Sequence, residues 1–218
     1  MSESRTDDTS GTLVVGTFLT LDGVMQAPGG PDEDRDSGFE HGGWTVNYWD
    51  ERMGERMDDQ FAGADALLLG RKTYEIFAAH WPHVDAKGDP VATKLNEMPK
   101  YVASRTLDSV EWNNSTLLSG DVAEAVEDLR NERGDVIMVQ GSQNLIQTLL
   151  AHDLVDEFWL WIFPVVLGVG KRLFGDGTVP AALELTDAET SSTGVQMLRF
   201  ERAGGVEYGS FALDNVAE

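Results

Sequence analysis

The chain has 218 residues, of which 41% are hydrophobic, and this is enough to bury the core of one domain. Its 38 acidic and 16 basic residues give a formal net charge of −22 at pH 7, which repels polyanions, so neither nucleic acid nor a membrane is expected as a partner. Cysteine is absent, which excludes disulfides, thiol catalysis and thiolate metal sites, and no metal is expected.

The composition also indicates where the protein works. The basic residues are 11 Arg and 5 Lys, and scarce lysine beside abundant Asp and Glu indicates a halophilic protein. The start of the chain has no hydrophobic signal segment, and no apolar run reaches the roughly 20 residues of a spanning helix. We therefore expect a cytoplasmic protein with a disordered tail at residues 1–11, one domain at residues 12–213 and a short tail at residues 214–218.

The first half of the chain alternates predicted strands and helices. A buried strand spans about residues 12–19, and the Gly-, Pro- and Asp-rich stretch that follows, through Gly43, is a candidate active-site loop. Apolar residues then recur at every fourth position, which predicts a helix over residues 44–61. A short strand ends at Gly70, and a helix over residues 71–79 follows directly.

The second half continues this alternation until its last segment. Strands are predicted in "KYVASR" and "DEFWLWIFPVV" and a helix in "SGDVAEAVEDLRNERG", while "VIMVQGSQNLIQTLL" turns from strand into helix. "GVQMLRFERAGGVEYGSFAL" has the pattern of two strands joined by Gly204 and Gly205. This order predicts an α/β fold with a mixed, mostly parallel sheet, flanked by helices and closed by a C-terminal antiparallel hairpin.

Two adjacent cations stand where one predicted strand turns into a helix. The strand that ends at Gly70 leaves backbone N–H groups unpaired at the helix start, and such groups attract anions. Arg71 and Lys72 add positive charge at the same point. The alternative is that Arg71 pairs with a nearby acid and that Lys72 is solvated.

Two further strand ends offer similar chemistry. Ser104 and Arg105 end the next predicted strand, at the edge where open α/β sheets bind their ligands. Gly141 allows close approach of the backbone after the strand that follows, and Ser142 can cap the next helix. Three strand ends therefore each offer a way to bind an anion.

Five motifs, in order, resemble one known family. They are "TLDGVM" (20–25), "GRKTYE" (70–75), "ASR" (103–105), "VIMVQGSQNL" (136–145) and "VDEFWLWIFPVVLGVGKRLF" (155–174). Together they resemble the dihydrofolate reductase-like fold, and more closely its branch related to the reductase domain of bacterial RibD, the bifunctional riboflavin-biosynthesis protein. The resemblance runs from about residue 12 to residue 213 and implies a mixed sheet with bound NADPH.

The resemblance also implies roles for the residues at the strand ends. One group would flank the 2′-phosphate of the cofactor, and another would contact its pyrophosphate. The first group is Gly70, Arg71, Lys72, Thr73, Ser104 and Arg105, and the second is Gly141, Ser142, Gln143, Asn144 and Leu145.

Asp22 is the expected catalytic residue and part of the substrate site. If the family geometry holds, the end of the first strand delivers this carboxylate where nicotinamide and substrate meet. The alternative is an Asp-Gly turn, which needs no ligand. Trp44 and Trp49 would bind the substrate by walling a flat heterocycle, or else they belong to the core.

The chain departs from the family pattern at three points. Gln140 stands where dihydrofolate reductases carry the first glycine of a Gly-Gly pair. No motif selects Asp50 or Glu51 as the carboxylate with which those enzymes hold the pterin, so the proton donor stays open between these acids and Asp22. The deaminase half of RibD is absent, because its zinc site needs cysteines.

Lys171 and Arg172, in "GVGKRL", leave two alternatives open. The segment is not a phosphate-binding P-loop, because neither Ser nor Thr follows Lys171. The two cations could hold a sugar phosphate of the substrate or form salt bridges at the surface.

These features predict an NADPH-dependent reductase of the RibD-reductase-like class that acts on a small heterocyclic or sugar-linked substrate. The leading candidate is 5-amino-6-(5-phosphoribosylamino)uracil, an intermediate of riboflavin biosynthesis. Dihydrofolate reduction, or reduction of another small heterocycle, is the alternative among enzymes, and an NADP-binding sensor module is the alternative outside them. The apolar stretch "FWLWIFPVVLG" (158–168) predicts a homodimer, because a chain this acidic needs an apolar patch to overcome self-repulsion.

Overall fold

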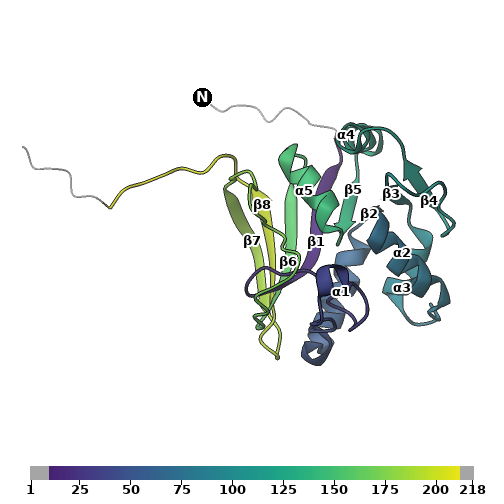
Figure 1. Cartoon of the computed structure of the whole chain (residues 1–218), viewed down its shortest axis with the longest axis horizontal. Coiled ribbons are helices and arrows are strands. Elements are labelled where there is room, and N and C mark those ends of the chain that lie inside the picture. Colours follow the sequence, from purple (N-terminus) through teal and green to yellow (C-terminus); the bar gives the residue numbers. More distant parts are fainter. Residues whose placement is uncertain (1–9, 212–218) are drawn as a thin grey trace, which may run out of the picture.

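The computed structural model describes residues 10–211, which are built around one sheet (Figure 1). Its strand order is β4-β3-β2-β5-β1-β6-β8-β7. The strands from β4 to β6 pair in parallel and β8 and β7 pair antiparallel, which confirms the mixed, mostly parallel sheet. The strands are β1 (Thr12–Thr20), β2 (Ala66–Gly70), β3 (Lys100–Ala103), β4 (Ser115–Leu118), β5 (Val136–Gln140), β6 (Glu157–Phe163), β7 (Leu183–Thr190) and β8 (Gln196–Arg202).

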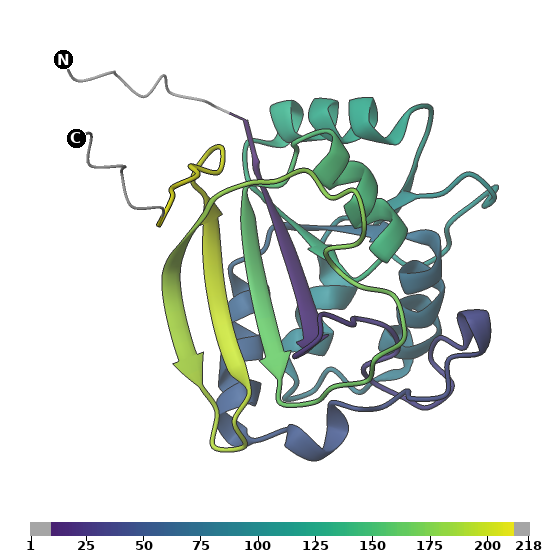
Figure 2. The ribbon, with the colours of Figure 1, turned by 60° about the vertical axis from the view of Figure 1, so that its left-hand side comes forward.

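Helices cover both faces of this sheet, and Figure 2 shows α5 in front of the strands and α1 behind them. The helices are α1 (Glu51–Ala62), α2 (Arg71–His80), α3 (Pro90–Glu97), α4 (Val122–Arg133) and α5 (Gln143–Ala151). Because side chains alternate along a strand, Val14 and Val15 of β1 enter different cores. Val15 packs in the core with α4 and α5, and Val14 in the core with α1, α2 and α3.

The chain changes face between the neighbouring strands β2 and β5. After β2 it enters α2 on one face, and after β5 it enters α5 on the other. Open α/β sheets bind ligands at such a switch point, outside the carboxyl ends of the strands. Because β1, β2, β3 and β5 run in parallel, the loops that follow them gather at this edge.

The C-terminal hairpin uses other residues than the sequence suggested. β7 and β8 pair across a tight turn in which the Ser191 N–H donates to the Val195 carbonyl oxygen. Residues 203–211 form no strand, so the hairpin predicted around Gly204 and Gly205 is wrong. β7 gives a weak sequence signal because it is an edge strand, "LELTDAET", with few apolar side chains and no fully buried one.

The helix predicted over residues 44–61 begins later, at Glu51. Asp50 accepts a hydrogen bond from the Met53 N–H (2.9 Å) and caps α1 there, whereas the residues before it form a 3-10 turn (Val46–Tyr48). α3 and β4 were not predicted from the sequence. The predicted tails lie outside the described residues, except for residues 10 and 11. Between residues 10 and 211, every helix is too short or too polar to cross a bilayer.

Candidate active site

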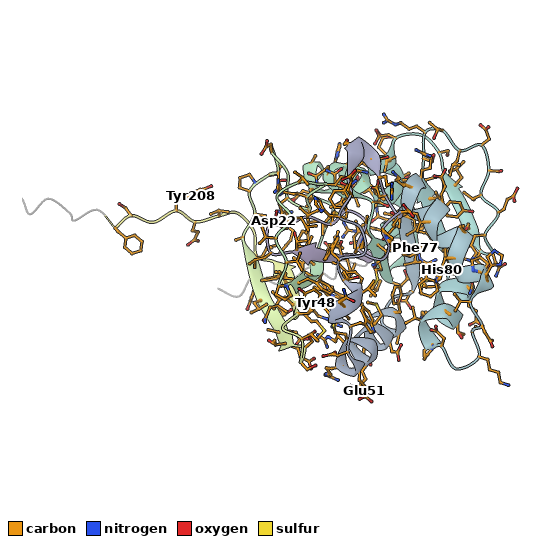
Figure 3. All side chains as sticks on the ribbon, turned by 60° about the horizontal axis from the view of Figure 1, so that its bottom comes forward. Asp22, Tyr48, Glu51, Phe77, His80 and Tyr208 are labelled. Carbon is orange, nitrogen blue, oxygen red and sulfur yellow. The ribbon has the colours of Figure 1, made fainter. Side chains whose placement is uncertain are left out.

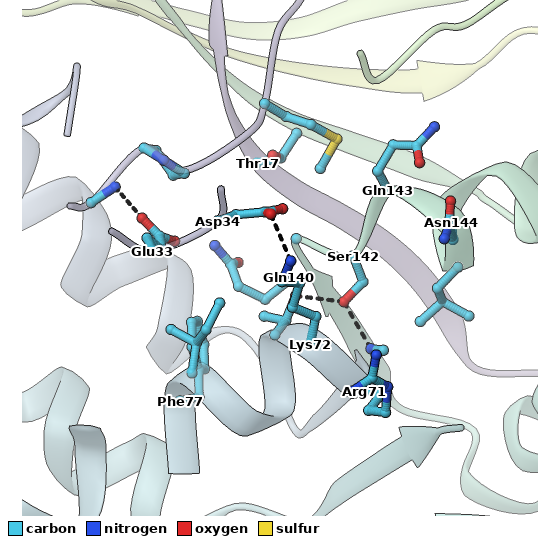
Figure 4. A pocket seen from close by; sticks show the side chains of 18 of the residues that line it. Thr17, Glu33, Asp34, Arg71, Lys72, Phe77, Gln140, Ser142, Gln143 and Asn144 are labelled. Atoms are coloured by element: carbon cyan, nitrogen blue, oxygen red, sulfur yellow. Dashed lines mark hydrogen bonds and ion pairs between the residues drawn. The ribbon is translucent and has the colours of Figure 1, made fainter. Parts of the chain in front are cut away.

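A cavity of about 1050 Å³ lies at the edge where the chain changes face (Figure 4). Its walls come from the loop after β1, from α1, from the starts of α2 and α5, and from the end of β3. The structure thus brings together the three strand ends that the sequence singled out. All the expected cofactor residues line this cavity: Gly70, Arg71, Lys72, Thr73, Ser104, Arg105, Gly141, Ser142, Gln143, Asn144 and Leu145.

Two helices begin at this cavity without a side-chain cap. α2 follows Gly70 and α5 follows Ser142, and at neither position does a side chain bond to the first turn. By contrast, an aspartate caps each of α1, α3 and α4. The first-turn N–H groups of α2 and α5 therefore favour an anionic ligand, and the helix dipoles add to the attraction.

Ser142 does not cap α5 as expected, because its hydroxyl group joins the two strand ends. The oxygen accepts a hydrogen bond from the Gly70 N–H (2.8 Å), and the hydroxyl donates to Thr73 Oγ1 (2.7 Å). A Cβ at Gly70 would lie 2.9 Å from both Ser142 Cβ and Oγ, so a larger residue does not fit without a shift. This contact fixes the starts of α2 and α5 relative to each other.

The backbone between β5 and α5 is left-handed at two successive residues. The φ angle is +59° at Gly141 and +70° at Ser142. Gln140, the last residue of β5, lines the cavity. Its Oε1 atom is buried and has no hydrogen-bond partner among the described residues. The atom faces Gly16 of the neighbouring strand β1, 3.1 Å from where a Cβ of residue 16 would lie, so this oxygen is not open to the cavity.

Two arginines stand at the strand ends that face the cavity. Arg71 forms an ion pair with Glu75 (3.0 Å), one turn along α2, which confirms the pairing alternative. Both side chains are exposed, and such a pair contributes little energy, so Arg71 can still bind an anion. Arg105 forms no ion pair with any residue between 10 and 211.

Lys72 and Lys171 share two aspartates from the loop after β1. Lys72 Nζ lies 2.6 Å from both Asp34 Oδ1 and Asp36 Oδ1, and Lys171 Nζ lies 2.6 Å from Asp34 Oδ2 and 2.7 Å from Asp36 Oδ2. We call these four residues the lysine–aspartate cluster. Lys72 is therefore ion-paired while its side chain stays 38% exposed, and the structure shows the salt-bridge alternative for Lys171.

The cluster also sets the charge of its two acids. Hydrogen bonds from Lys171 and Lys72 lower the pKa of Asp36 to about 2. Burial works against the charged form of Asp34, but the same two lysines outweigh burial and lower the pKa of this carboxyl group too. Both carboxyl groups therefore stay charged at neutral pH.

Asp22 lies outside the cavity lining, and Figure 3 shows it well apart from Phe77, which belongs to the lining. Its carboxylate accepts hydrogen bonds from Thr20 Oγ1 (2.6 Å) and from the backbone N–H groups of residues 167–168 (3.2 and 2.8 Å), and it pairs with Arg172 (3.2 Å). These contacts, above all the one from Thr20, hold the pKa of Asp22 well below its usual range. The geometry thus favours the turn alternative, because such an acid is a poor proton donor.

The other two acids that the sequence left open also face elsewhere. Asp50 caps α1 and accepts hydrogen bonds from the Ser192 N–H (2.8 Å) and hydroxyl group (2.6 Å). Glu51 is exposed at the start of α1 (Figure 3). Neither residue lines the cavity.

Glu33 lines the cavity, although the sequence gave no reason to select it. Its Oε2 atom accepts hydrogen bonds from the N–H groups of Gly29 (2.6 Å) and Gly30 (3.1 Å) (Figure 4). Burial raises the pKa of Glu33 and outweighs these bonds, and the charge of Asp34 adds to the rise. Nothing in "PDEDRD" (31–36) distinguishes this acid from its neighbours, because its burial depends on how the loop folds back.

Only one of the two tryptophans expected at the substrate lines the cavity. Trp49 does so, and its ring stacks on Trp161 with 5.8 Å between the centroids. Trp44 instead belongs to the core, where its indole N–H donates to the Gln26 carbonyl oxygen (2.9 Å) and its ring packs edge-on against Phe163. The wall near Trp49 continues with apolar side chains, namely Phe18, Met57, Phe61 and Phe77. Such surfaces suit a flat ring.

Comparisons with known proteins agree with this architecture. The model of the RibD C-terminal domain family matches residues 11–197. The uncharacterised protein YyaP of Bacillus subtilis (strain 168) is 29% identical over 197 residues, which cover 88% of this chain and 95% of YyaP.

Two solved structures share the fold. A diaminohydroxyphosphoribosylaminopyrimidine deaminase/5-amino-6-(5-phosphoribosylamino)uracil reductase from Thermotoga maritima superposes with a TM-score of 0.57 at 15% identity, over 89% of this chain and 57% of that one. Dihydrofolate reductase from Enterococcus faecalis, in complex with NADP(H) and RAB-propyl, gives 0.56 at 13% identity, over 89% of this chain and 98% of that one. The fold is therefore dihydrofolate reductase-like, as the motifs predicted. Because the family model spans most of the chain, this protein belongs to the RibD C-terminal domain family.

Proposed function

We propose that this protein is an NADPH-dependent oxidoreductase that reduces a small heterocycle. The observation that carries the proposal is a single cavity lined by two uncapped helix starts, two arginines and aromatic side chains. The helix starts and the arginines suit an anionic dinucleotide, and the aromatic side chains suit a flat ring. Membership of a reductase-like family supports the same chemistry.

The residues at the strand ends fit this cofactor. The first turns of α2 and α5 would hold the pyrophosphate, where Gly70 and Gly141 allow close approach of the backbone. Arg71 and Arg105 would hold the 2′-phosphate, together with Ser104, which directly precedes Arg105. When bound, the cofactor supplies a hydride.

The chain's own part is to orient the substrate, exclude water and supply a proton. Trp49 and Phe77 would stack on the ring and keep the site dry. Glu33 is the acid that lines the cavity with a raised pKa, so we assign it the proton at its carboxyl group. This assignment replaces the catalytic role expected for Asp22.

Two substrate classes are compatible with the family. One is the phosphoribosylaminopyrimidine named for the Thermotoga maritima enzyme, whose reduction belongs to riboflavin biosynthesis. The other is an unphosphorylated heterocycle, of which dihydrofolate is one example. The non-enzymatic alternative is a module that binds NADP as a sensor without turnover.

Assembly and cellular setting belong to the same proposal. The charge of −22 and the scarcity of lysine support a halophilic, cytoplasmic protein. We also retain the homodimer, although the first half of the segment that suggested it, in β6, is largely buried within the subunit.

The test measures binding first and turnover second. Calorimetric titration should show tighter binding of NADPH than of NADH, and Arg105→Ala should weaken only NADPH binding. Arg52→Ala, which changes an arginine of α1 outside the cavity, is the matched control and should leave both affinities unchanged. Loss of NADPH absorbance at 340 nm on adding candidate heterocycles then reports turnover. Failure to bind either cofactor contradicts the proposal, and binding without any turnover favours the sensor.

A further inference from the structure

In the lysine–aspartate cluster, Asp34 and Asp36 of the loop after β1 form ion pairs with Lys72 and Lys171. Each ammonium group, on Lys72 and on Lys171, contacts both Asp34 and Asp36 at 2.6 to 2.7 Å. Two positive charges are thus matched by two negative ones in short, charge-assisted hydrogen bonds. A phosphate group that approached either lysine would have to compete with two carboxylates that are already bound.

The other charged groups of the lining do not compensate. Arg71 and Arg105 stand at the strand ends that the proposed function gives to the cofactor. The acids of the described lining outside the cluster include Glu33 and Asp58, and Asp58 forms no ion pair within residues 10–211. With the cofactor bound at Arg71 and Arg105, as the proposed function has it, a phosphate group on the substrate, with a charge of roughly −1.5 to −2 at neutral pH, would meet two lysines that are already paired and the carboxylate of Asp58.

The lining also offers flat apolar faces, from Trp49 and Phe77. These faces suit an uncharged ring. They give a sugar phosphate nothing to replace the water that it would lose on binding.

We propose that the substrate is a flat heterocycle without a phosphate group, and that Asp34 and Asp36 enforce this choice by occupying Lys72 and Lys171. This inference rests on the proposed function, because it concerns the substrate side of the same cavity. It selects the unphosphorylated class over the phosphoribosylaminopyrimidine. It also makes Asp34 and Asp36 specificity-determining residues, because their ion pairs keep Lys72 and Lys171 from binding a phosphate group of the substrate.

Exposure ranks the two aspartates. The Asp34 side chain is 11% exposed and that of Asp36 is 53% exposed, so water screens the contacts of Asp36 more strongly. Replacement of Asp34 should therefore free the lysines more than replacement of Asp36. The double variant Asp34→Asn/Asp36→Asn keeps the shape of both side chains and removes both charges.

The experiment compares ribose 5-phosphate with ribose, which differ by one phosphate group. Both are titrated calorimetrically into the protein saturated with NADP⁺, so that the cofactor covers Arg71 and Arg105. The native protein should bind the two sugars equally weakly. In the double variant, ribose 5-phosphate should bind at least about tenfold more tightly than ribose, as a freed charge-assisted contact allows. Adding Lys171→Met to the double variant should abolish most of this gain.

The matched control is Asp108→Asn/Asp128→Asn, which removes two exposed carboxylates that do not line the cavity. It changes the net charge by the same amount and should leave the preference unchanged. Native protein that prefers ribose 5-phosphate to ribose would overturn the inference. A double variant that shows a native circular dichroism spectrum and no gain would overturn it too. If the double variant unfolds, the single variants are measured, and Asp34→Asn must gain more than Asp36→Asn.

These outcomes are separate from the fate of the proposed function. If NADP⁺ does not bind, the proposed function fails, and the sugar titration is repeated with Arg71→Ala/Arg105→Ala present in every protein. The difference between the aspartate variants and their control still reports Lys72 and Lys171 in that background. If all of these proteins bound ribose 5-phosphate and ribose with equal affinity, this result would contradict the role of the aspartates, whatever the outcome for the cofactor.

Discussion

For single residues, the surroundings of a carboxyl group set its pKa and so decide whether it can donate a proton. Asp22 and Glu33 follow the same strand, yet their pKa values shift in opposite directions. The hydroxyl group of Thr20 and two backbone N–H groups stabilise the charged form of Asp22, whereas burial destabilises that of Glu33. Of these two acids, only Glu33 lines the cavity, so one carboxyl group stabilises a turn and the other is the one that we propose as the proton donor.

Asp22→Asn should lower the free energy of unfolding by about 1 to 3 kcal/mol, because an amide replaces a carboxylate that accepts several hydrogen bonds. Turnover of the folded variant should stay near the native value. Urea unfolding and steady-state kinetics measure the two effects, with Asp108→Asn as the control for an exposed acid. A variant of native stability that has lost turnover would restore the catalytic role of Asp22.

Glu33→Gln should reduce turnover about a hundredfold or more, the usual loss for a general acid, and leave NADPH affinity unchanged. The native rate should fall as pH rises through the pKa of Glu33, because the carboxyl group then loses the proton that it donates. Since burial raises this pKa, that fall should occur above the value of about 4.3 typical of a solvated glutamate. The variant should lack this limb of the pH profile.

Asp58→Asn is the control for Glu33→Gln, because it changes another acid of the same cavity. It should keep the native pH profile of turnover.

The pH dependence of the free energy of unfolding is a second test of the raised pKa of Glu33. The folded state holds the Glu33 proton more tightly than the unfolded state does, so this group lowers stability as pH rises through the window between the two pKa values. A Glu33→Gln protein with the native pH profile would show that the proton comes from elsewhere.

Arg71→Ala should weaken NADPH binding about ten- to a hundredfold, the worth of one charge-assisted hydrogen bond, and should leave NADH binding nearly unchanged. The reason is that the two cofactors differ by one phosphate and that the acidic protein has no diffuse positive field to attract it. Glu75→Gln removes the partner of Arg71 and should not weaken binding. Equal losses for both cofactors after Arg71→Ala would mean that Arg71 supports the loop or the pyrophosphate instead.

At the scale of elements, the site depends on how α2 and α5 start side by side. Both helices follow parallel, neighbouring strands and leave on opposite faces, so their first turns meet at one edge of the sheet. The hydroxyl group of Ser142 bonds across this junction instead of capping its own helix. A side chain that joins two elements should therefore affect every ligand that contacts both.

Ser142→Ala should lower the free energy of unfolding by about 1 to 3 kcal/mol, because the Gly70 N–H loses its partner. It should weaken NADPH and NADH by the same factor, since both carry the pyrophosphate. Thr73→Val removes only the other bond of the hydroxyl group and should have a smaller effect. Titration of both cofactors checks this, and a loss confined to NADPH would place Ser142 at the 2′-phosphate.

At the scale of the whole molecule, the apolar segment that suggested a dimer serves the subunit itself. β6 lies between β1 and β8, and its residues Phe158, Leu160 and Trp161 are buried in the two cores. The exposed apolar residues of this region lie in the loop that follows, at Val166 and Val169. A homodimer would have to use such residues against the repulsion of two chains of charge −22.

Light scattering should detect a species of twice 23.9 kDa, and its share should rise with salt, because salt screens the repulsion between the subunits. The measurement is made over a series of protein concentrations at low and at molar salt. A single 23.9 kDa species in all conditions would rule the dimer out.

The sequence by itself determined the features that depend on local pattern and chain order. Alternating strands and helices predicted the parallel part of the sheet except for β4, and Gly70 and Gly141 marked two of the strand ends that line the cavity. These signals are local, because a turn such as that at Gly141 needs its own φ angle whatever packs around it.

Only the tertiary structure decided which polar groups face the cavity and which are already paired. Lys171 meets Asp34 across more than a hundred residues of chain. Burial disfavours the charged form of both Glu33 and Asp34, but only Asp34 has lysine partners among residues 10–211. The edge strand β7 likewise exists through its pairing with β8, since its own sequence is largely polar. The physical reason is that burial and ion pairing depend on distances between segments that are remote in sequence, which no local pattern encodes.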